Sequence, residues 1–179
     1  MKRIVIIGCS GSGKSTFSRK LQQLKGNPLY HLDKLFWLPD WELRSAEEQD
    51  RIQKGLVQED KWIIDGNYQR SLPIRLERAD TIFLFDYPRR VCLYRAMKRI
   101  VSNRKRTRPD MGEGCPERFD WEFMKFIWNF NKNNRPGLVA LLDQAPDGIE
   151  IQHFRRPCET ANYLRALGEQ VDIQKEEAA

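Results

Sequence analysis

The chain has 179 residues, of which 40% are hydrophobic and 31% are charged. A chain of this size and composition can fold as one globular domain without disulfides, and it is neither disordered nor fibrous. The longest strongly apolar run, residues 4–7, is far shorter than a membrane span, and the N-terminus does not resemble a signal peptide. The four cysteines form no C-x-x-C pair, so no zinc site is expected. These features predict a cytoplasmic protein without a membrane partner.

The net charge of +6 comes from one segment. Residues 89–108 contain nine of the 31 Lys and Arg residues and no acid. The rest of the chain contains 22 basic and 25 acidic residues, so it carries no positive excess. A generally basic nucleic-acid coat would spread this charge over the whole chain. The distribution instead predicts one local anion-binding surface.

The hydrophobic pattern alternates between strand-like and helix-like segments along the chain. Short apolar runs predict parallel strands at residues 2–7, 29–33, 61–65, 81–86 and 149–154. Helical spacing predicts helices at 15–24, 45–59, 88–103, 120–131, 138–142 and 159–167. Ser45 followed by Glu48 is a capping-box signature for the second of these helices. The alternation predicts an α/β fold with a parallel sheet covered by helices on both faces.

Other segments are expected to be irregular. We predict loops at residues 36–41 and 104–117, and a frayed tail from Gln170 onward. The whole is expected to form one domain over residues 1–168. Within it we expect a helical segment at 34–60 beside a phosphate acceptor and a mobile lid at 104–118, followed by a flexible tail at 169–179.

Residues 8–15 read GCSGSGKS and satisfy the phosphate-binding loop (P-loop) pattern G-x-x-x-x-G-K-S/T, between an apolar strand and an amphipathic helix. Glycines let successive backbone N–H groups point at a polyphosphate, and the helix N-terminus adds its positive dipole. Lys14 is expected to reach the β- and γ-phosphates and Ser15 to ligate Mg²⁺. The residues expected to contact ATP here are Gly8, Ser10, Gly11, Ser12, Gly13, Lys14, Ser15 and Thr16.

Three aspartates follow apolar strands, where ligands bind in parallel sheets. Asp65, followed by Gly66, is favoured over Asp86 as the carboxylate that orients Mg²⁺, because Asp86 is also placed to cap the next helix. Asp33 is a candidate to accept a hydroxyl proton or to hold the acceptor, with a turn aspartate as the alternative.

The basic segment supplies candidate cations for a transferring phosphoryl group. Arg95, Arg99 and Arg106 are expected on one stripe, opposite a core face of Leu93, Met97, Ile100 and Val101. Arg104, Arg106 and Arg108 continue into a glycine-containing loop that could close over substrate. We assign catalytic roles to Arg95, Arg99 and Arg104, and nucleotide binding to Arg106.

Aromatic residues lie between the second strand and the capped helix. Phe36, Trp37 and Trp41 could enclose a small acceptor, although such residues more often belong to a core. Tyr68, Arg70 and Arg75 could line the same cavity.

Several segments together resemble the bacterial family of DNA topology modulation proteins (FlaR-like), an offshoot of the adenylate kinase group of P-loop kinases. They are GCSGSGKS, YHLDKLFW, WIIDGNY, FLFDYPRRVCLYR and RTRPDMGEGCPERFDWEF. The resemblance extends to about Leu167. It implies a three-layer P-loop fold with sheet order 2-3-1-4-5, ATP with Mg²⁺, and a lid over the phosphates.

The resemblance to adenylate kinases is incomplete at the acceptor side. Asp65-Gly66 matches the start of their D-G-F-P-R segment, but Asn67-Tyr68-Gln69 replaces the remainder, so the nucleotide contact of that arginine is not carried over. Asp33 is placed like the acceptor-binding aspartate of shikimate-type kinases. The acceptor is therefore left open.

Three functions are compatible with these features. The leading one is an ATP-dependent kinase of a nucleotide or related small metabolite. The alternative is a nucleic-acid-associated ATPase or regulator that affects DNA topology, with residues 89–108 on DNA phosphates; no dedicated DNA-reading motif is present to support it. The third is a nucleotide sensor that acts through protein partners.

Overall fold

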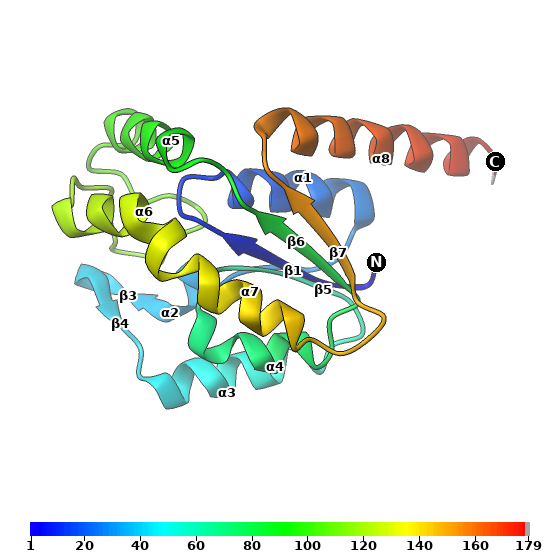
Figure 1. Ribbon diagram of the computed structural model, residues 1–179, viewed down its shortest axis with the longest axis horizontal. Helices are drawn as coiled ribbons and strands as arrows, with labels where there is room; N and C mark the ends of the chain where they lie inside the picture. Colours follow the sequence, from blue (N-terminus) through cyan, green and yellow to red (C-terminus); the bar gives the residue numbers. More distant parts are fainter. Residues whose placement is uncertain (178–179) are drawn as a thin grey trace.

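A five-stranded parallel sheet lies at the centre of the computed structural model, which describes residues 1–177 (Figure 1). Its strands are β1 (Arg3–Gly8), β2 (Leu29–His31), β5 (Trp62–Asp65), β6 (Thr81–Phe85) and β7 (Glu150–Phe154). They lie in the order β2-β5-β1-β6-β7. Counted within this sheet alone, the order is 2-3-1-4-5, which confirms the predicted topology; two short strands outside the sheet, β3 and β4, account for the different labels.

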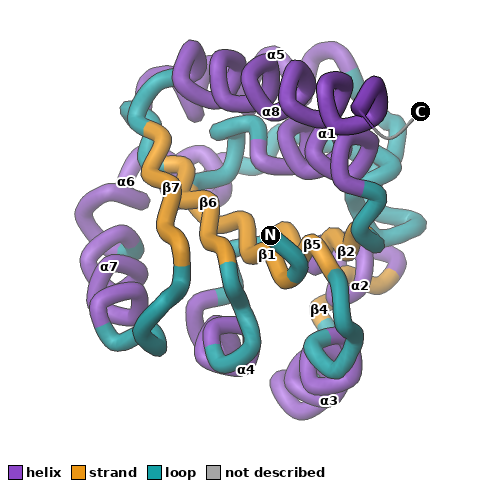
Figure 2. Tube along the Cα trace, turned by 90° about the vertical axis from the view of Figure 1, so that its right-hand side faces the viewer, coloured by secondary structure: helices purple, strands orange, loops and turns teal. Residues whose placement is uncertain are grey.

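Helices cover both faces of the sheet. They are α1 (Lys14–Lys25), α2 (Leu32–Phe36), α3 (Ala46–Leu56), α4 (Leu72–Leu76), α5 (Arg89–Ser102), α6 (Trp121–Asn133), α7 (Arg135–Asp143) and α8 (Pro157–Glu177). Figure 2 shows α1 and α8 on one side of the sheet and α3, α4 and α7 on the other. Helices α5 and α6 pack against each other beyond the carboxyl ends of the strands (Figure 1). Among the described residues, no helix is both long and apolar enough to span a membrane.

The register of the central strands determines where functional groups meet. Ile4 to Ile7 are fully buried because β1 lies between β5 and β6 with helices on both faces. Ile6 pairs with Asp65, and Gly8 pairs with Phe85. The carboxyl ends of β1, β5 and β6 therefore meet at one edge of the sheet. These ends lead to the P-loop, to Asp65 and to Asp86.

Local signals in the sequence fix several helix starts. Ser45 and Glu48 form the predicted capping box of α3, each side chain bonding to the other's backbone N–H. Asp120 caps α6 by accepting hydrogen bonds from the N–H groups of Glu122 and Phe123.

The prediction for residues 29–41 was wrong in two places. The strand ends at His31, because Leu32 and Phe36, four residues apart, both enter the core from the short helix α2. The expected loop at 36–41 is instead an antiparallel pair, β3 (Trp37–Leu38) and β4 (Glu42–Leu43), joined by a 3₁₀ turn at Pro39–Trp41. We call residues 37–43 the acceptor hairpin.

The predicted core face of α5 was wrong for two of its four residues, since Ile100 is buried and Leu93 packs against the core. The buried residues are Cys92, Ala96 and Ile100, whereas Met97 is 38% and Val101 is 73% exposed. Large apolar residues suggested the other face, but α5 turns its small residues inward because it packs directly on the P-loop. A Cβ atom on Gly11 would lie 2.2 Å from the carbonyl oxygen of Cys92.

The C-terminal helix is longer than expected. Instead of ending near Leu167, α8 continues to Glu177, so residues 169–177 of the predicted tail are helical. The chain contains no proline after Pro157 to end the helix, and Gly168 is tolerated within it. Residues 178–179 of the predicted tail lie outside the described residues.

Candidate active site

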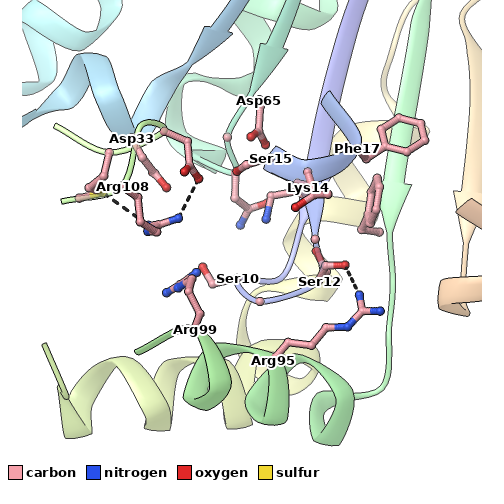
Figure 3. Close-up of a pocket in the computed structure, with 18 of the residues that line it drawn as sticks. Ser10, Ser12, Lys14, Ser15, Phe17, Asp33, Asp65, Arg95, Arg99 and Arg108 are labelled. Atoms are coloured by element: carbon pink, nitrogen blue, oxygen red, sulfur yellow. Dashed lines mark hydrogen bonds and ion pairs between the residues drawn. The ribbon is translucent and has the colours of Figure 1, made fainter. Parts of the chain in front are cut away.

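A cavity of about 1020 Å³ opens at the carboxyl ends of the strands. It is bounded by the P-loop, by α2 and the end of β5, by α5 and α6, and by the lid segment, residues 104–118 (Figure 3). Small-molecule sites commonly occupy roughly 300–1000 Å³, so this cavity can accommodate a nucleotide and a second small ligand.

The P-loop has the geometry of an anion cradle. Gly11 and Gly13 adopt φ angles of 80° and 97°, which L side chains rarely adopt. The N–H groups of Lys14, Ser15 and Thr16 at the start of α1 have no hydrogen-bond acceptor within residues 1–177. The Lys14 ammonium donates to the carbonyl of Cys9 at 2.9 Å and lies at the same cavity wall. Free amides, the helix dipole and one ammonium together suit a polyphosphate.

The groups predicted for Mg²⁺ lie on this wall as well. Ser15 and Asp65 both line the cavity, and Asp65 is 4% exposed and paired with Nδ1 of His31 at 2.9 Å. No cluster of three or more His, Cys, Asp or Glu side chains able to hold a metal ion occurs among the residues described. This donor set fits Mg²⁺ in a phosphate site, where one or two protein oxygens suffice and phosphates and water complete the shell.

Asp86 is engaged elsewhere. Its carboxylate accepts hydrogen bonds from the Arg135 guanidinium at 2.7–2.9 Å and lies 3.0 Å from Nε2 of His153. Burial opposes ionisation, but these two partners hold the pKa of Asp86 below its ordinary value. The helix-capping role considered for Asp86 is wrong, since Pro88 occupies the N-cap position of α5 and no side chain caps it.

Asp33 lies at the opposite side of the cavity from α5, close to Arg108 (Figure 3). Its carboxylate accepts a hydrogen bond from the Tyr68 hydroxyl at 2.8 Å. Burial raises the pKa of Asp33 above its ordinary value; the Tyr68 hydrogen bond opposes this rise, and the nearby Asp65 charge adds to it. A carboxylate with a raised pKa is a better proton acceptor than an ordinary one.

Two of the predicted arginines reach the P-loop from α5 (Figure 3). Arg95 donates to the carbonyl of Ser12 at 3.0 Å, and Arg99 lies one helical turn further on. Arg99 forms an ion pair with Glu117 of the lid segment at 3.0 Å. Burial and the neighbouring Arg108 charge lower the pKa of Arg99, and Glu117 opposes this effect.

The other predicted arginines lie elsewhere. Arg104 and Arg106 are exposed and are absent from the lining of the cavity, so the structure does not bring them to the P-loop. The turn after α5 carries them outward, where the backbone of Arg106 pairs with that of Glu117. Arg108 enters the cavity instead. The basic segment is therefore divided between a cavity wall and an outer surface and does not form a single anion-binding face.

Two buried carboxylates in the lid segment were missed by the sequence reasoning. Arg108 pairs with Asp110 at 2.7 Å and with Glu117, and Arg19 lies 3.5 Å from Asp110. Burial opposes ionisation of Asp110, but the Arg108 charge and a hydrogen bond with Ser15 keep its pKa below the ordinary value. The alternation of basic and acidic residues in RTRPDMGEGCPER was the available signal for internal pairing.

The lid segment is attached to the acceptor hairpin. The Cys115 thiol lies 3.0 Å from the carbonyl of Leu38, and Asp40 N–H donates to Gly114 O at 3.2 Å. A Cβ on Gly112 would lie 2.0 Å from the carbonyl oxygen of Trp37, so only glycine allows this approach. The expected mobile loop is therefore packed against the acceptor side of the cavity in this structure.

The aromatic candidates separate into core and cavity residues. Phe36 is fully buried and packs on Tyr68 with ring centroids 4.7 Å apart. Trp37 and Trp41 line the cavity as an edge-to-face pair with centroids 5.7 Å apart. Phe36 thus belongs to the core, whereas Trp37 and Trp41 lie where they could contact a ligand.

Arg70 and Arg75 do not line the cavity, since both are engaged elsewhere. Arg75 is fully buried and donates to the carbonyls of Gly66 and Tyr68, and burial lowers its pKa to about 9. Arg70 binds Asp50 on the surface. Arg75 therefore shapes the backbone that carries Tyr68.

No protein-family model and no curated protein matches the chain. Among solved structures, it is similar to the shikimate kinase of Acinetobacter baumannii in complex with shikimate (14% identity, TM-score 0.60, 98% of this chain and 95% of that one). It is also similar to the shikimate kinase of Bacteroides thetaiotaomicron (15%, 0.60, 96% and 98%) and to a sugar kinase from a Janibacter species (16%, 0.50, 95% and 91%).

At these identities the comparisons show the fold, which is that of the P-loop kinases. They do not single out the adenylate kinase group or the FlaR-like family, and both assignments stay predictions.

Proposed function

We propose that the protein is an ATP-dependent phosphotransferase that moves the γ-phosphate of ATP to a nucleotide or another small metabolite. The observation that carries the proposal is one cavity shared by the P-loop, with its free N–H groups and Lys14, and by the carboxylates Asp33 and Asp65. A phosphate cradle alone would suit a nucleotide sensor. The half-buried Asp33 carboxylate across the same cavity gives an acceptor hydroxyl a partner.

The P-loop side of the cavity would bind the nucleotide. The N–H groups of Lys14, Ser15 and Thr16 would donate to phosphate oxygens, and the Lys14 ammonium would neutralise the β- and γ-phosphates. Ser15 and Asp65 would hold Mg²⁺, which neutralises phosphate charge when bound. His31 fixes the orientation of the Asp65 carboxylate through its hydrogen bond.

The lid and α5 would stabilise charge on the transferring group. Arg99 and Arg108 lie in the cavity near the P-loop and Asp33, and both pair with Glu117 in this structure. A phosphoryl group between them would compete with Glu117 for these cations. This pairing orients the two guanidinium groups before substrate enters.

Asp33 would accept the proton of the attacking hydroxyl. Its carboxylate lines the cavity, is oriented by Tyr68, and has a raised pKa. The bond between the γ-phosphorus and the bridging oxygen of ADP breaks as the bond to the acceptor oxygen forms. The proton passes from the acceptor hydroxyl to Asp33, so atoms and charge balance.

A coupled ADP-release assay with Mg²⁺-ATP and a panel of nucleotides, nucleosides, sugars and hydroxy acids tests the proposal. We expect at least one acceptor to raise ADP release well above the rate with water alone. Lys14→Met should abolish this rate, whereas Arg106→Gln, at an exposed arginine outside the cavity, should retain it. A flat response to every acceptor, with normal ATP binding, would contradict a kinase and favour a sensor.

A nucleic-acid-associated ATPase would have to use the outward members of the basic segment. These are Arg89, Arg90, Lys98, Arg104, Lys105 and Arg106. The similar solved structures are small-molecule kinases, and no observation favours a DNA complex over a small acceptor.

A further inference from the structure

The residues at the end of the cavity away from α5 indicate what kind of acceptor could bind there. It is lined by Asp33, Trp37, Trp41, Asn67, Tyr68 and Gln69. Of these six residues one is an acid and none is a cation, and the cations beside them are Arg108 (Figure 3) and Arg118. If the protein is a phosphotransferase as proposed above, this is the wall that an acceptor would contact.

The arginines around this wall are already engaged. Arg75 is fully buried beneath it and donates to two backbone carbonyls, and Arg70 is directed outward to Asp50. Arg108 lies in the cavity but is paired with Asp110 and Glu117, which are 6% exposed each. Asp110 also pairs with Arg19, and Glu117 also pairs with Arg99, so the cation nearest Asp33 is held in a network of ion pairs.

Arg118 is the remaining cation near this end among the described cavity residues. It is exposed, and its guanidinium lies over the Trp41 ring, 5.3 Å from the centroid. An exposed cation at the rim, screened by water and salt, offsets the charge of the half-buried Asp33 poorly. A phosphate or carboxylate on the acceptor would therefore meet the Asp33 carboxylate at a wall where the nearest buried cation, Arg108, is already held in ion pairs.

The remaining groups suit a neutral ring compound. Trp37 and Trp41 offer an aromatic surface, and Tyr68 and Gln69 contribute uncharged polar groups. The indole Nε1 of Trp41 and the side-chain oxygen of Asn67 are buried without a hydrogen-bond partner. A ligand hydroxyl could satisfy either atom after a small side-chain rotation, since each such atom left unpaired is costly.

We propose that the acceptor is an uncharged, hydroxyl-bearing ring compound, a nucleoside or a sugar, and not its phosphorylated or carboxylated counterpart. The inference rests on the proposed function and narrows it, since it excludes nucleotides as acceptors. The hydroxyl oxygen attacks the γ-phosphorus and its proton passes to Asp33, so no further reactant is needed. Repulsion between Asp33 and an acceptor anion about 5 Å away, at an effective dielectric constant of about 20, corresponds to a preference of about 100-fold or more.

Matched pairs of acceptors test the inference with the full chain and Mg²⁺-ATP. The nucleoside arm compares adenosine with AMP and cytidine with CMP, and the sugar arm compares ribose with ribose 5-phosphate. A third pair compares shikimate methyl ester with shikimate, which carries a carboxylate. In the pair that the enzyme accepts as substrate, we expect kcat/KM to be about 100-fold higher for the uncharged member. Which arm contains that pair shows whether the acceptor is a nucleoside or a sugar.

Arg118→Gln provides the second measurement. If the acceptor is uncharged, the ratio of kcat/KM between uncharged and charged members should change by less than about threefold in this variant. If the wild type prefers the charged member and Arg118→Gln abolishes that preference, the inference is overturned, whereas the proposed kinase function still stands. ADP release that responds to no acceptor of either class would overturn both the inference and the proposed function.

Discussion

Gly11→Ala tests the contact between the P-loop and α5. Gly11 has a φ of 80°, and its added Cβ would lie 2.2 Å from the Cys92 carbonyl oxygen and 3.3 Å from the Ala96 Cβ. The nearest atom belongs to the backbone of a buried helix, which cannot rotate away. The alanine variant must therefore displace either the P-loop or α5.

The expected cost has two parts. An L residue at this positive φ costs about 1–2 kcal/mol, and overpacking of a buried contact costs about 1–3 kcal/mol more. The sum is about 2–5 kcal/mol. For a chain of this size each 1 kcal/mol lowers Tm by about 2–4 °C, so Tm should fall by roughly 4–20 °C.

Gly26→Ala is the matched control. Gly26 also has a positive φ, 72°, but a Cβ there would have no atom within 4 Å. Its cost is the backbone strain alone, about 1–2 kcal/mol, or a few degrees in Tm.

Thermal unfolding and calorimetry with a non-hydrolysable Mg²⁺-ATP analogue separate the two variants. Gly11→Ala should lose more stability than Gly26→Ala and should bind the analogue at least about tenfold more weakly, whereas Gly26→Ala should bind like the wild type. Equal losses of stability, or unchanged nucleotide affinity in Gly11→Ala, would refute the argument that this contact shapes the P-loop.

Three further outcomes follow from the site. Asp65→Asn should reduce Mg²⁺-dependent turnover by about 10–100-fold, since its carboxylate is expected to orient the ion; a wild-type rate in a Mg²⁺ titration would contradict this. Asp86→Asn should lower Tm by several degrees, because it loses about 1–3 kcal/mol from its bonds to Arg135, while the kinetics stay near wild type. A kinetic loss without a stability loss would instead make Asp86 the carboxylate that orients Mg²⁺. Turnover should fall as pH drops through the raised pKa of Asp33, which must be ionised to accept a proton. Tyr68→Phe removes the hydrogen bond that opposes this rise, so the acidic limb of the kcat/KM–pH profile should move to higher pH; a shift to lower pH would exclude Asp33 as the base.

The sequence was sufficient for the features whose signals are local. The P-loop pattern and the buried run at residues 4–7 define a strand, a turn and a helix within a few residues of one another, and the capping box marks the start of α3 in the same way. The sheet order followed from the family resemblance and agrees with the structure.

The features that the sequence could not give depend on partners far along the chain. Asp65 and Asp86 both follow apolar strands, and only the fold shows that Arg135 binds Asp86. The inward face of α5 is set by its close approach to Gly11, which favours small residues over large apolar ones. Arg108 and Glu117 are brought together by the fold of the lid segment, which periodicity does not encode.

The central claim is that the P-loop binds Mg²⁺-ATP in the cavity that Asp33 shares. Calorimetric titration of the wild-type protein and of Lys14→Met with a non-hydrolysable ATP analogue and Mg²⁺ tests it most directly. We predict saturable one-site binding by the wild type and loss of that binding in Lys14→Met. A cooperative thermal unfolding transition in each protein checks that both are folded. Absence of binding heat with the wild type, or equal affinity in the two proteins, would contradict the account.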